Sequence, residues 1–451
     1  MNSCCNRVSA LVRILIITGI VVATGTASQA ANVAPFIAHQ AIKWQGTVIN
    51  VEPIAPFYKR RFFNGIWTAR KGLTPKGVEL VNLLSQSGSD GLEPSDYLSN
   101  WPGNADQLTG ENLVAAELYL SDAAVRYIRD LHSGRTTPAV SEPDIVIARK
   151  KIDNTALLNE MNKSGPAKVA AKLRPSHRQY QAMRKLLAST SDPAARQKII
   201  VNMERWRWVP SNLGKNHILV NVAAFKMHTR SNGKTVDTRR VIVGSEYHKT
   251  PMFSSAINHS QFNPTWTISR NIAGNEILPK LRRDPGYLEK RGYDLYASWE
   301  PDAPKMNAAQ IDWESVNGKK FPYKIVQPPG PDNALGVVKF LFPNKFNVYL
   351  HDTANRDLFS GPNRALSHGC IRVEKPMEFA NILYQLDKNP AAPKLQAVVD
   401  SEKTTAVKFR KEIPVHLAYF TLWVDEAGKV QNFKDVYGRD KLVANLLFGS
   451  V

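Results

Sequence analysis

The chain has 451 residues, of which 43% are hydrophobic and 22% charged, so it can bury a sizeable core and is neither disordered nor fibrous. Its formal net charge of +20 is compatible with a nucleic acid, a membrane surface or an acidic substrate as partner, and does not choose among them. The three cysteines, Cys4, Cys5 and Cys370, are too few and unsuitably placed for a disulfide framework or a four-thiolate metal site.

Residues 1–30 have the pattern of a cleaved secretory signal peptide. They contain two arginines and no acidic residue, followed by an apolar stretch over 14–23 and a small-residue run that ends at Ala30. The apolar stretch has about ten residues, whereas a spanning helix needs ~20, and Ser28 and Ala30 fit the positions that precede a cleavage site. The sequence therefore predicts export to the periplasm or cell envelope, with no transmembrane span in the mature chain; an uncleaved anchor is the alternative.

Removal of this segment leaves a single cysteine, Cys370. A lone thiol in an exported protein has no intramolecular partner. It is therefore an inert buried residue, an intermolecular bridge or a reactive nucleophile.

Helical periodicity dominates from the end of a lead-in strand or linker to about residue 208. The clearest helix has apolar residues every three or four positions from Leu113 to Leu131, with Thr109 as a cap and Gly134 beyond the last turn. Shorter helices are predicted over 77–85 and 180–188. In the run 203–208 we expect the tryptophans to close a domain junction and the arginines to lie on the surface; base stacking on a nucleic acid is the alternative.

After Pro210 the hydrophobic period changes to two. A strand is predicted from Ile218 to Ala224, and the tight turn at Asn232-Gly233 leads into a partner strand over 236–243, which together form a hairpin. Residues 261–330 are rich in Pro, Gly and Tyr, so they are too aromatic for a solvated linker and predict a lid or capping insertion. Further strands are predicted over 335–341 and 346–351, a helix after Lys375-Pro376, and one more strand with an amphipathic tail from Val415 onward.

The chemistry-bearing residues follow the strand over 346–351. Its alternation predicts that His351 points away from the core, beside Tyr349. About fifteen residues later comes Cys370, preceded by Gly369, where a missing β-carbon lets successive N–H groups converge as an oxyanion hole requires. A neighbouring imidazole can accept the thiol proton or hold it in a thiolate/imidazolium pair, and spacing alone does not decide between His351 and His368.

Two runs around these residues carry a family signature: Tyr349-Leu350-His351-Asp352-Thr353 and Ser367-His368-Gly369-Cys370-Ile371-Arg372. They resemble the L,D-transpeptidase (YkuD-type) catalytic domain. Further blocks are similar to the large periplasmic, YcbB-like members of that family: Asp90-Gly91-Leu92, Val241-Ile242-Val243-Gly244, Lys249-Thr250-Pro251-Met252 and Asp284-Pro285-Gly286-Tyr287-Leu288. Large relatives commonly carry an inserted peptidoglycan-binding domain, for which the 21 residues between Tyr180 and Asn202 leave no room.

The resemblance implies an α+β fold with an N-terminal helical scaffold domain and a mixed, β-sandwich-like catalytic domain. With the signal peptide at 1–30, the expected division is a scaffold over 31–208, a catalytic domain over 209–400 with the capping insertion over 261–330, and a C-terminal extension over 401–451 that packs on both.

The resemblance also implies the roles of the site residues. Cys370 is expected to attack the carbonyl that joins the third residue of a peptidoglycan tetrapeptide stem to its terminal D-alanine, with His351 as general base and the N–H groups of Gly369 and Cys370 as the oxyanion hole. D-Alanine leaves, and the acyl group passes to an amine of a second stem or of an outer-membrane protein. His368 is expected to be supportive, and the substrate-binding candidates are Tyr349, Arg372, Trp266 and Ser367.

Alternatives remain at this point. The same acyl-enzyme resolved by water gives a carboxypeptidase or endopeptidase, and a dead site gives a wall-binding protein. We expect no cofactor, because His351 and His368 lack a third ligand at metal-site spacing, and no nucleic-acid partner. The family resemblance further implies a role in cell-wall organisation and cell shape, and carbapenems as inhibitors.

Overall fold

A computed structural model describes residues 14–16, 31–103, 105–146 and 150–449. Most of the predicted signal peptide lies outside these residues. Of it, only β1 (Ile14–Ile16) is described, and it pairs in parallel with β2 (Ala41–Trp44), which forms a hairpin with β3 (Thr47–Asn50). None of the described helices combines the length and the apolarity that crossing a bilayer requires.

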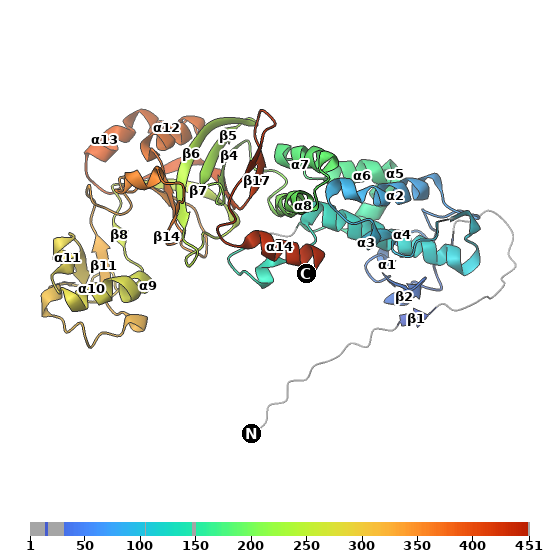
Figure 1. Ribbon diagram of the computed structural model, residues 1–451, viewed down its shortest axis with the longest axis horizontal. Coiled ribbons are helices and arrows are strands. Elements are labelled where there is room, and N and C mark those ends of the chain that lie inside the picture. Colours follow the sequence, from blue (N-terminus) through green and yellow to red (C-terminus); the bar gives the residue numbers. More distant parts are fainter. Residues whose placement is uncertain (1–13, 17–30, 104, 147–149, 450–451) are drawn as a thin grey trace, which may run out of the picture.

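The N-terminal region is a helical layer built around α4 (Gly110–Ser133). As predicted, this helix starts after Thr109, ends before Gly134 and buries its apolar stripe. Around it lie α1 (Ala55–Lys59), α2 (Pro75–Ser85), α3 (Ser95–Leu98), α5 (Asn154–Ser164) and α6 (Pro166–Leu173), in the blue and cyan part of Figure 1. The Thr74 hydroxyl caps α2 by accepting from the Gly77 N–H at 3.1 Å.

Helices α7 (Arg178–Ser189) and α8 (Pro193–Trp208) lie between the helical layer and the sheet (Figure 1). Trp206 and Trp208 are buried in the same core as the sheet, as expected for a junction. The expectation of surface arginines was wrong: Arg205 and Arg207 are each only 1% exposed. They tolerate burial because each has a carboxylate partner, Asp440 for Arg205 and Glu204 for Arg207.

The second region is a nine-stranded mixed sheet that closes on itself. Its strand order is β14-β6-β15-β13-β12-β7-β16-β4-β5, and β5 pairs back onto β6. The strands are β4 (Asn216–Asn221), β5 (Lys226–Ser231), β6 (Lys234–Gly244), β7 (Phe253–Phe262), β12 (Val338–Leu341), β13 (Leu350–His351), β14 (Ala365–Ser367), β15 (Ile371–Val373) and β16 (Thr405–Ala418). Such closure leaves few free edges.

The predicted turn at Asn232-Gly233 joins β5 to β6. Both residues have positive φ, 51° and 79°, as the two-residue turn of a hairpin requires. The expected pairing of strand 218–224 with strand 236–243 was wrong. The strand from 218 ends at Asn221, a turn leads into β5, which was not predicted, and β5 is the strand that pairs with β6.

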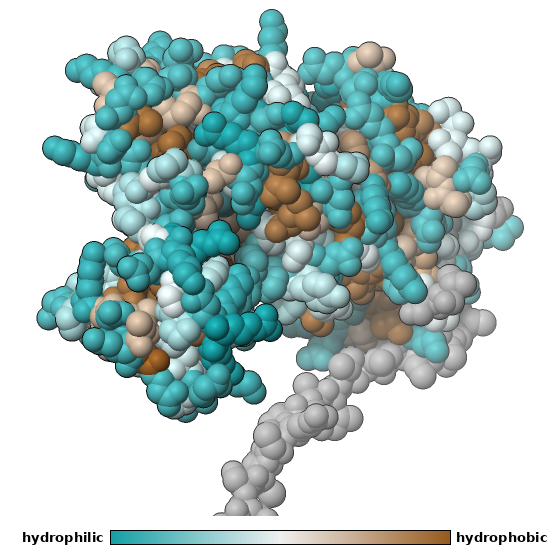
Figure 2. All heavy atoms as spheres, turned by 60° about the vertical axis from the view of Figure 1, so that its left-hand side comes forward, coloured by the Kyte–Doolittle hydropathy of each residue, from teal (hydrophilic) through white to brown (hydrophobic). Residues whose placement is uncertain are grey.

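Between β7 and β12 the chain forms a small body with its own apolar core, where the capping insertion was expected. Its four-stranded sheet has the order β10-β9-β11-β8. The elements are β8 (Trp266–Thr267), α9 (Arg270–Ile272), the π-helix η4 (Ala273–Ile277), α10 (Leu278–Arg283), α11 (Tyr287–Lys290), β9 (Asp294–Tyr296), β10 (Lys305–Met306) and β11 (Lys324–Gln327). Figure 2 shows it as a largely hydrophilic lobe, set off from the rest by a hollow.

The C-terminal part of the chain completes the sheet. The predicted helix after Lys375 is α12 (Pro376–Leu386), followed by α13 (Leu395–Asp400), β17 (Leu422–Val424), β18 (Val430–Asn432) and α14 (Arg439–Phe448). Strand β16 lies between β7 and β4, so the segment expected as a packing extension supplies a central strand. Short 3₁₀ helices are η1 (Ser87–Asp90), η2 (Ala105–Gln107), η3 (Pro138–Val140), η5 (Ala308–Gln310), η6 (Gly318–Lys320), η7 (Arg356–Phe359) and η8 (Ala392–Lys394).

Candidate active site

A cavity of about 530 Å³ lies between the sheet and the capping insertion. It is lined by Trp266, Thr267, Ser269, Ile272, Glu276, Ala334, Leu335, Phe346, Asn347, Tyr349, His351, Ser367, His368, Cys370 and Arg372. Seven of the eight residues singled out in the sequence therefore line one cavity. The eighth, Gly369, directly precedes Cys370 in the chain. The capping insertion contributes part of the lining.

The pairing of β13 with β15 brings the two sequence motifs together. These strands are parallel, with Leu350 opposite Ile371 and His351 opposite Arg372. The Ile371 N–H donates to the Tyr349 carbonyl at 3.1 Å, so Tyr349 lies beside Cys370. Residues about twenty positions apart in the sequence thus meet at one strand end.

The strand expected over 346–351 is shorter in the structure. Asn347 has a φ of 54°, which interrupts the extended chain, and the Asn344 side chain bonds Phe342 and Val348 of the same loop. His351 lies on the face away from Leu350 and the apolar core and lines the cavity, although it is only 4% exposed.

The Cys370 thiol is half-buried and donates a long hydrogen bond to the Asn347 carbonyl at 3.7 Å. Burial raises the pKa of the thiol to about 11, although hydrogen bonding by Tyr349 and the charge of Arg372 act in the opposite direction. The resting side chain is therefore a protonated thiol at neutral pH.

The His351 imidazole is held in one tautomer. Its Nδ1 lies 2.5 Å from the Asp352 carbonyl, which can only accept, so Nδ1 carries the proton and Nε2 has a free lone pair. Burial, helped by the charge of Arg372, lowers the pKa of His351 to about 3. Because the thiol is a far weaker acid than the imidazolium, the neutral thiol and neutral imidazole are favoured over the thiolate/imidazolium pair.

The loop before Cys370 is tightly tied. Gly369 has a φ of 108°, which suits glycine, and its carbonyl accepts from the Thr250 hydroxyl at 2.8 Å. The Ser367 hydroxyl donates to the Cys370 carbonyl at 2.5 Å and accepts from the Gly369 N–H at 3.2 Å. Within the described part of the chain the Cys370 N–H has no acceptor, so it is the open donor of the two proposed for the oxyanion hole.

His368 points to the capping insertion. Its Nε2 lies 2.5 Å from Glu276 Oε1 on η4, and its ring lies 4.5 Å from that of His248. The two partners are 39% and 42% exposed, so the contact lies at the mouth of the cavity. Nothing in the sequence marked Glu276 as a site residue, because it is brought in only by the fold of the insertion.

Cationic groups surround the thiol. Arg372 is partly buried, has no carboxylate partner in the described ranges, and burial lowers its pKa. Lys339 on β12 lies opposite His351, with its Nζ 5.7 Å from the centre of the Tyr349 ring. These charges favour an anionic ligand or a developing negative charge in the cavity.

Two structural residues of the site were missed in the sequence. Thr250 belongs to a block that resembles the family, yet nothing in that block revealed that its hydroxyl supports Gly369. Asn347 supplies the carbonyl that faces the thiol. Among the residues that the structure describes, no group of three or more His, Cys, Asp or Glu side chains is arranged to hold a metal ion.

Comparisons with known proteins cover both regions of the chain. A family model described as a scaffold domain matches residues 52–187, and the model of the L,D-transpeptidase catalytic domain (YkuD) matches residues 215–404. A Haemophilus influenzae protein whose name assigns it provisionally to the L,D-transpeptidases is 30% identical over 397 residues. That alignment covers 86% of this chain and 78% of the relative.

The solved structures that are similar to this chain have low sequence identity to it. An L,D-transpeptidase from Mycobacterium smegmatis is 11% identical with a TM-score of 0.22, over 45% of this chain and 58% of that one. The L,D-transpeptidase LdtMt1 in complex with imipenem is 12% identical with a TM-score of 0.21, over 45% and 59%. This chain thus spans less than two thirds of the length of either solved chain.

Proposed function

Because the chain belongs to the L,D-transpeptidase family, we propose that it is a peptidoglycan L,D-transpeptidase in which Cys370 forms the acyl-enzyme. The observation that carries this proposal is the register of β13 and β15. It brings the only thiol in the described ranges and an imidazole with a free Nε2 into one cavity. A nucleophile beside a base whose other nitrogen is fixed is the arrangement that nucleophilic catalysis requires.

In the first step Sγ of Cys370 attacks the carbonyl between the third residue of a tetrapeptide stem and its terminal D-alanine. His351 Nε2 takes the thiol proton, and the Cys370 N–H donates to the oxyanion that forms. As the tetrahedral intermediate collapses, the C–N bond breaks and the imidazolium returns the proton to the amine of the departing D-alanine. A thioester on Cys370 remains.

In the second step the amine of an acceptor attacks the thioester carbonyl. His351 Nε2 takes a proton from that amine, the C–S bond breaks, and the proton returns to the Cys370 sulfur. The product carries a new amide bond, either a 3→3 stem crosslink or a bond to an outer-membrane protein. The resting pKa values of Cys370 and His351 imply that the proton moves only as the carbonyl is attacked.

The remaining cavity residues receive roles from their contacts. The unpaired Arg372 guanidinium is suited to a stem carboxylate, and the rings of Tyr349 and Trp266 form walls against which the stem packs. Ser367 is better suited to order the loop than to bind substrate, because its hydroxyl is already engaged there. His368, paired with Glu276, supports the site from its rim.

We also propose the division into a signal peptide at 1–30, a scaffold domain at 31–208, a catalytic domain at 209–400 with its insertion at 261–330, and a C-terminal segment at 401–451 whose strand β16 is part of the catalytic sheet. The separate apolar cores of the helical layer and of the insertion support these two units, while α7 and α8 share the core of the sheet. Peptidoglycan lies in the cell envelope, so the proposed function requires that the protein is exported. The basic composition would favour contact with the carboxylates of the wall.

Incubation of the purified protein with a disaccharide tetrapeptide tests the proposed function. We expect crosslinked dimers and one released D-alanine per bond formed, and neither product with Cys370→Ala. Disaccharide tripeptide without dimer would show instead that water resolves the thioester, as in a carboxypeptidase. Intact substrate with the folded wild-type protein would favour a wall-binding protein with a dead site.

A further inference from the structure

The catalytic residues belong to a row of side chains that continues across the sheet. His351 lies opposite Arg372 on β15 and opposite Lys339 on β12. Lys339 in turn lies opposite Gln261 on β7, and Gln261 lies opposite Ala406 on β16. Because directly paired residues of neighbouring strands point to the same face, these side chains form one row that starts beside the thiol.

A second row runs beside the first. Two positions further along β12, Leu341 lies opposite His259 on β7, and His259 lies opposite Lys408 on β16. Side chains two positions apart in a strand share a face, so both rows lie on the same face. The residue between the rows on β12, Phe340, is fully buried in the apolar core, whereas Lys408 is exposed. The two rows therefore form the outer face of β15, β13, β12, β7 and β16.

This outer face carries cations that have no internal partner. Among the described residues, Arg372, Lys339 and Lys408 form no ion pair with a carboxylate. Partial burial and the charges of Lys339 and Lys408 lower the pKa of His259, so both ammonium groups lie near this ring. Burial lowers the pKa of Lys339, and the charge of Cys370 acts in the opposite direction. Positive charge thus extends from the thiol across the sheet to β16.

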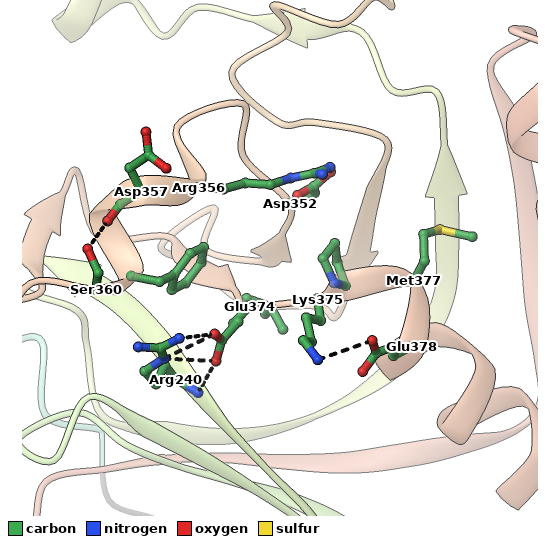
Figure 3. Close-up of a pocket in the computed structure, with 12 residues that line it drawn as sticks. Arg240, Asp352, Arg356, Asp357, Ser360, Glu374, Lys375, Met377 and Glu378 are labelled. Atoms are coloured by element: carbon green, nitrogen blue, oxygen red, sulfur yellow. Dashed lines mark hydrogen bonds and ion pairs between the residues drawn. The ribbon is translucent and has the colours of Figure 1, made fainter.

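The opposite face of the catalytic strands pairs its cations. A hollow of about 440 Å³ lies there, lined by the residue that follows β13 and by the last residue of β15 (Figure 3). Arg240 donates to Glu374, and the Lys375 Nζ lies 3.5 Å from the Glu378 carboxylate. The outer face is therefore the one whose positive charge is left for a ligand, and an anionic ligand complements it.

The dimensions of the outer face fit an extended peptide. Neighbouring strands lie ~4.8 Å apart, so β16, four strands from β15, is about 19 Å away from it. An extended chain spans at most about 3.3 to 3.6 Å per residue, so about four residues reach from β15 to β7 and about six reach β16.

We propose that the outer face binds an extended acidic peptide that has one end at the Cys370 thiol and pairs its carboxylates with Lys339 and Lys408. This inference rests on the proposed function, under which the peptide is the stem that Cys370 attacks. Neither lysine lines the catalytic cavity, so the surface lies beyond the groups that touch the reacting atoms. It selects acidic stems and holds them across the strands while the carbonyl lies at the thiol.

Fluorescence anisotropy of rhodamine-labelled hexaglutamate with the full chain tests this surface. The probe is an acidic peptide of about the required length, and it has no D-alanine to release. We expect saturable binding that weakens strongly with added salt, and no saturable binding of a glycine–serine hexapeptide with the same label. Lys408→Glu, at an exposed position, should weaken hexaglutamate binding at least fivefold, and Lys339→Gln at least threefold.

Lys185→Glu on α7 is the matched control. It makes the same charge change at an exposed lysine away from the sheet, so hexaglutamate binding should be unchanged. Equal losses of binding in Lys185→Glu and Lys408→Glu would show that only the net charge matters and would overturn the proposal. Tighter binding of rhodamine-labelled hexathymidylate than of hexaglutamate would overturn an acidic peptide as the occupant.

Kinetics with the disaccharide tetrapeptide distinguish the surface from the reaction. Lys408→Glu should raise the KM for D-alanine release at least threefold and leave kcat unchanged. An unchanged KM in an active Lys408→Glu variant would overturn the surface and leave the proposed function in place. Hexaglutamate binding that Lys408→Glu weakens, in a wild-type protein that releases no D-alanine, would support the surface and contradict the proposed function.

Discussion

Glu117 in the helical layer and His351 in the catalytic cavity are both buried ionisable groups, yet they differ in how completely they are bonded. The Glu117 carboxylate accepts from five donors: the main-chain N–H groups of Ile66, Trp67 and Thr68 and the hydroxyls of Tyr58 and Thr68. His351 has one hydrogen-bonding partner among the described residues, on Nδ1, and its Nε2 is open. A saturated buried group fixes a fold, whereas an unsaturated one is available for chemistry.

Two arginines repeat this contrast. Arg207 at the junction donates to Glu204 and to the Tyr180 hydroxyl and is fully enclosed. Arg372 is partly buried in the cavity and, unlike Arg207, has no carboxylate partner within the described ranges; the Nε atoms of both arginines lack a partner there. The helical region thus pairs its buried charges internally, and the catalytic region leaves some of them for a ligand.

The largest effect on chemistry is expected from His351→Asn. The shorter amide can still donate to the Asp352 carbonyl but has no equivalent of Nε2, so the rate of D-alanine release should fall about 10²- to 10⁴-fold. The midpoint of thermal unfolding should change little. If the rate of D-alanine release falls by less than tenfold in a folded variant, His351 is not the general base, and the contrast with Glu117 does not hold.

The converse change is Glu117→Gln. The amide NH₂ would face main-chain N–H groups that need acceptors, so the free energy of unfolding should fall by about 2 to 3 kcal/mol. Urea titration measures this, and D-alanine release by the remaining folded protein should be unchanged. Glu160→Gln, at an exposed position on α5, is the control and should leave the free energy of unfolding unchanged. A Glu117 variant that is as stable as wild type but releases D-alanine more slowly would contradict a purely structural role for Glu117.

The pH dependence separates catalysis from stability. With a pKa of about 3 for His351 and about 11 for Cys370, kcat/KM should be flat between about pH 5 and pH 9 as long as the protein stays folded. Stability behaves differently, because burial also lowers the pKa of His177, His228 and His416 to about 4. The unfolded chain therefore binds more protons below about pH 6.5, and stability is lost as the pH falls from there toward 4.

Parallel pH profiles of kcat/KM and of the thermal midpoint test this prediction. We expect activity in acid to be lost together with the folded state. A decrease in kcat/KM with an apparent pKa near 6.5, at pH values where the thermal midpoint is unchanged, would show that His351 titrates as an exposed imidazole.

The smallest effect is expected from Glu276→Gln. The contact with His368 is more than a third exposed on both sides, and such pairs contribute about 0.2 to 1 kcal/mol, equivalent to about a one- to fivefold change in kcat/KM. A larger loss, of the size expected for His351, would place Glu276 among the catalytic groups. Asp284→Asn, an exposed carboxylate elsewhere on the insertion, is the matched control.

Local patterns were sufficient for much of the fold. The limits of α4 follow from its apolar period with Thr109 and Gly134 at its ends, and the Asn232-Gly233 turn before β6 was predicted, although its partner strand β5 was not. Burial of Arg205 was not predictable from neighbouring residues, because its partner Asp440 lies far along the chain. Long-range packing decides such positions.

In the candidate site, too, local patterns predicted some features and long-range packing decided the others. The cysteine and histidine motifs identified Cys370 and His351 as candidates from sequence alone, and the structure brings both to one cavity. The burial of His351 and the contact of Glu276 depend on the closed sheet and on the insertion, which no short pattern encodes.

The most direct measurement is the intact mass of the protein after treatment with imipenem, for the wild type and for Cys370→Ala. Attack of Sγ on the β-lactam carbonyl opens the ring without a leaving group, so we expect one whole imipenem added to the wild type and none to the variant. An adduct of equal amount on both proteins, or none on a folded wild type, would contradict Cys370 as the nucleophile.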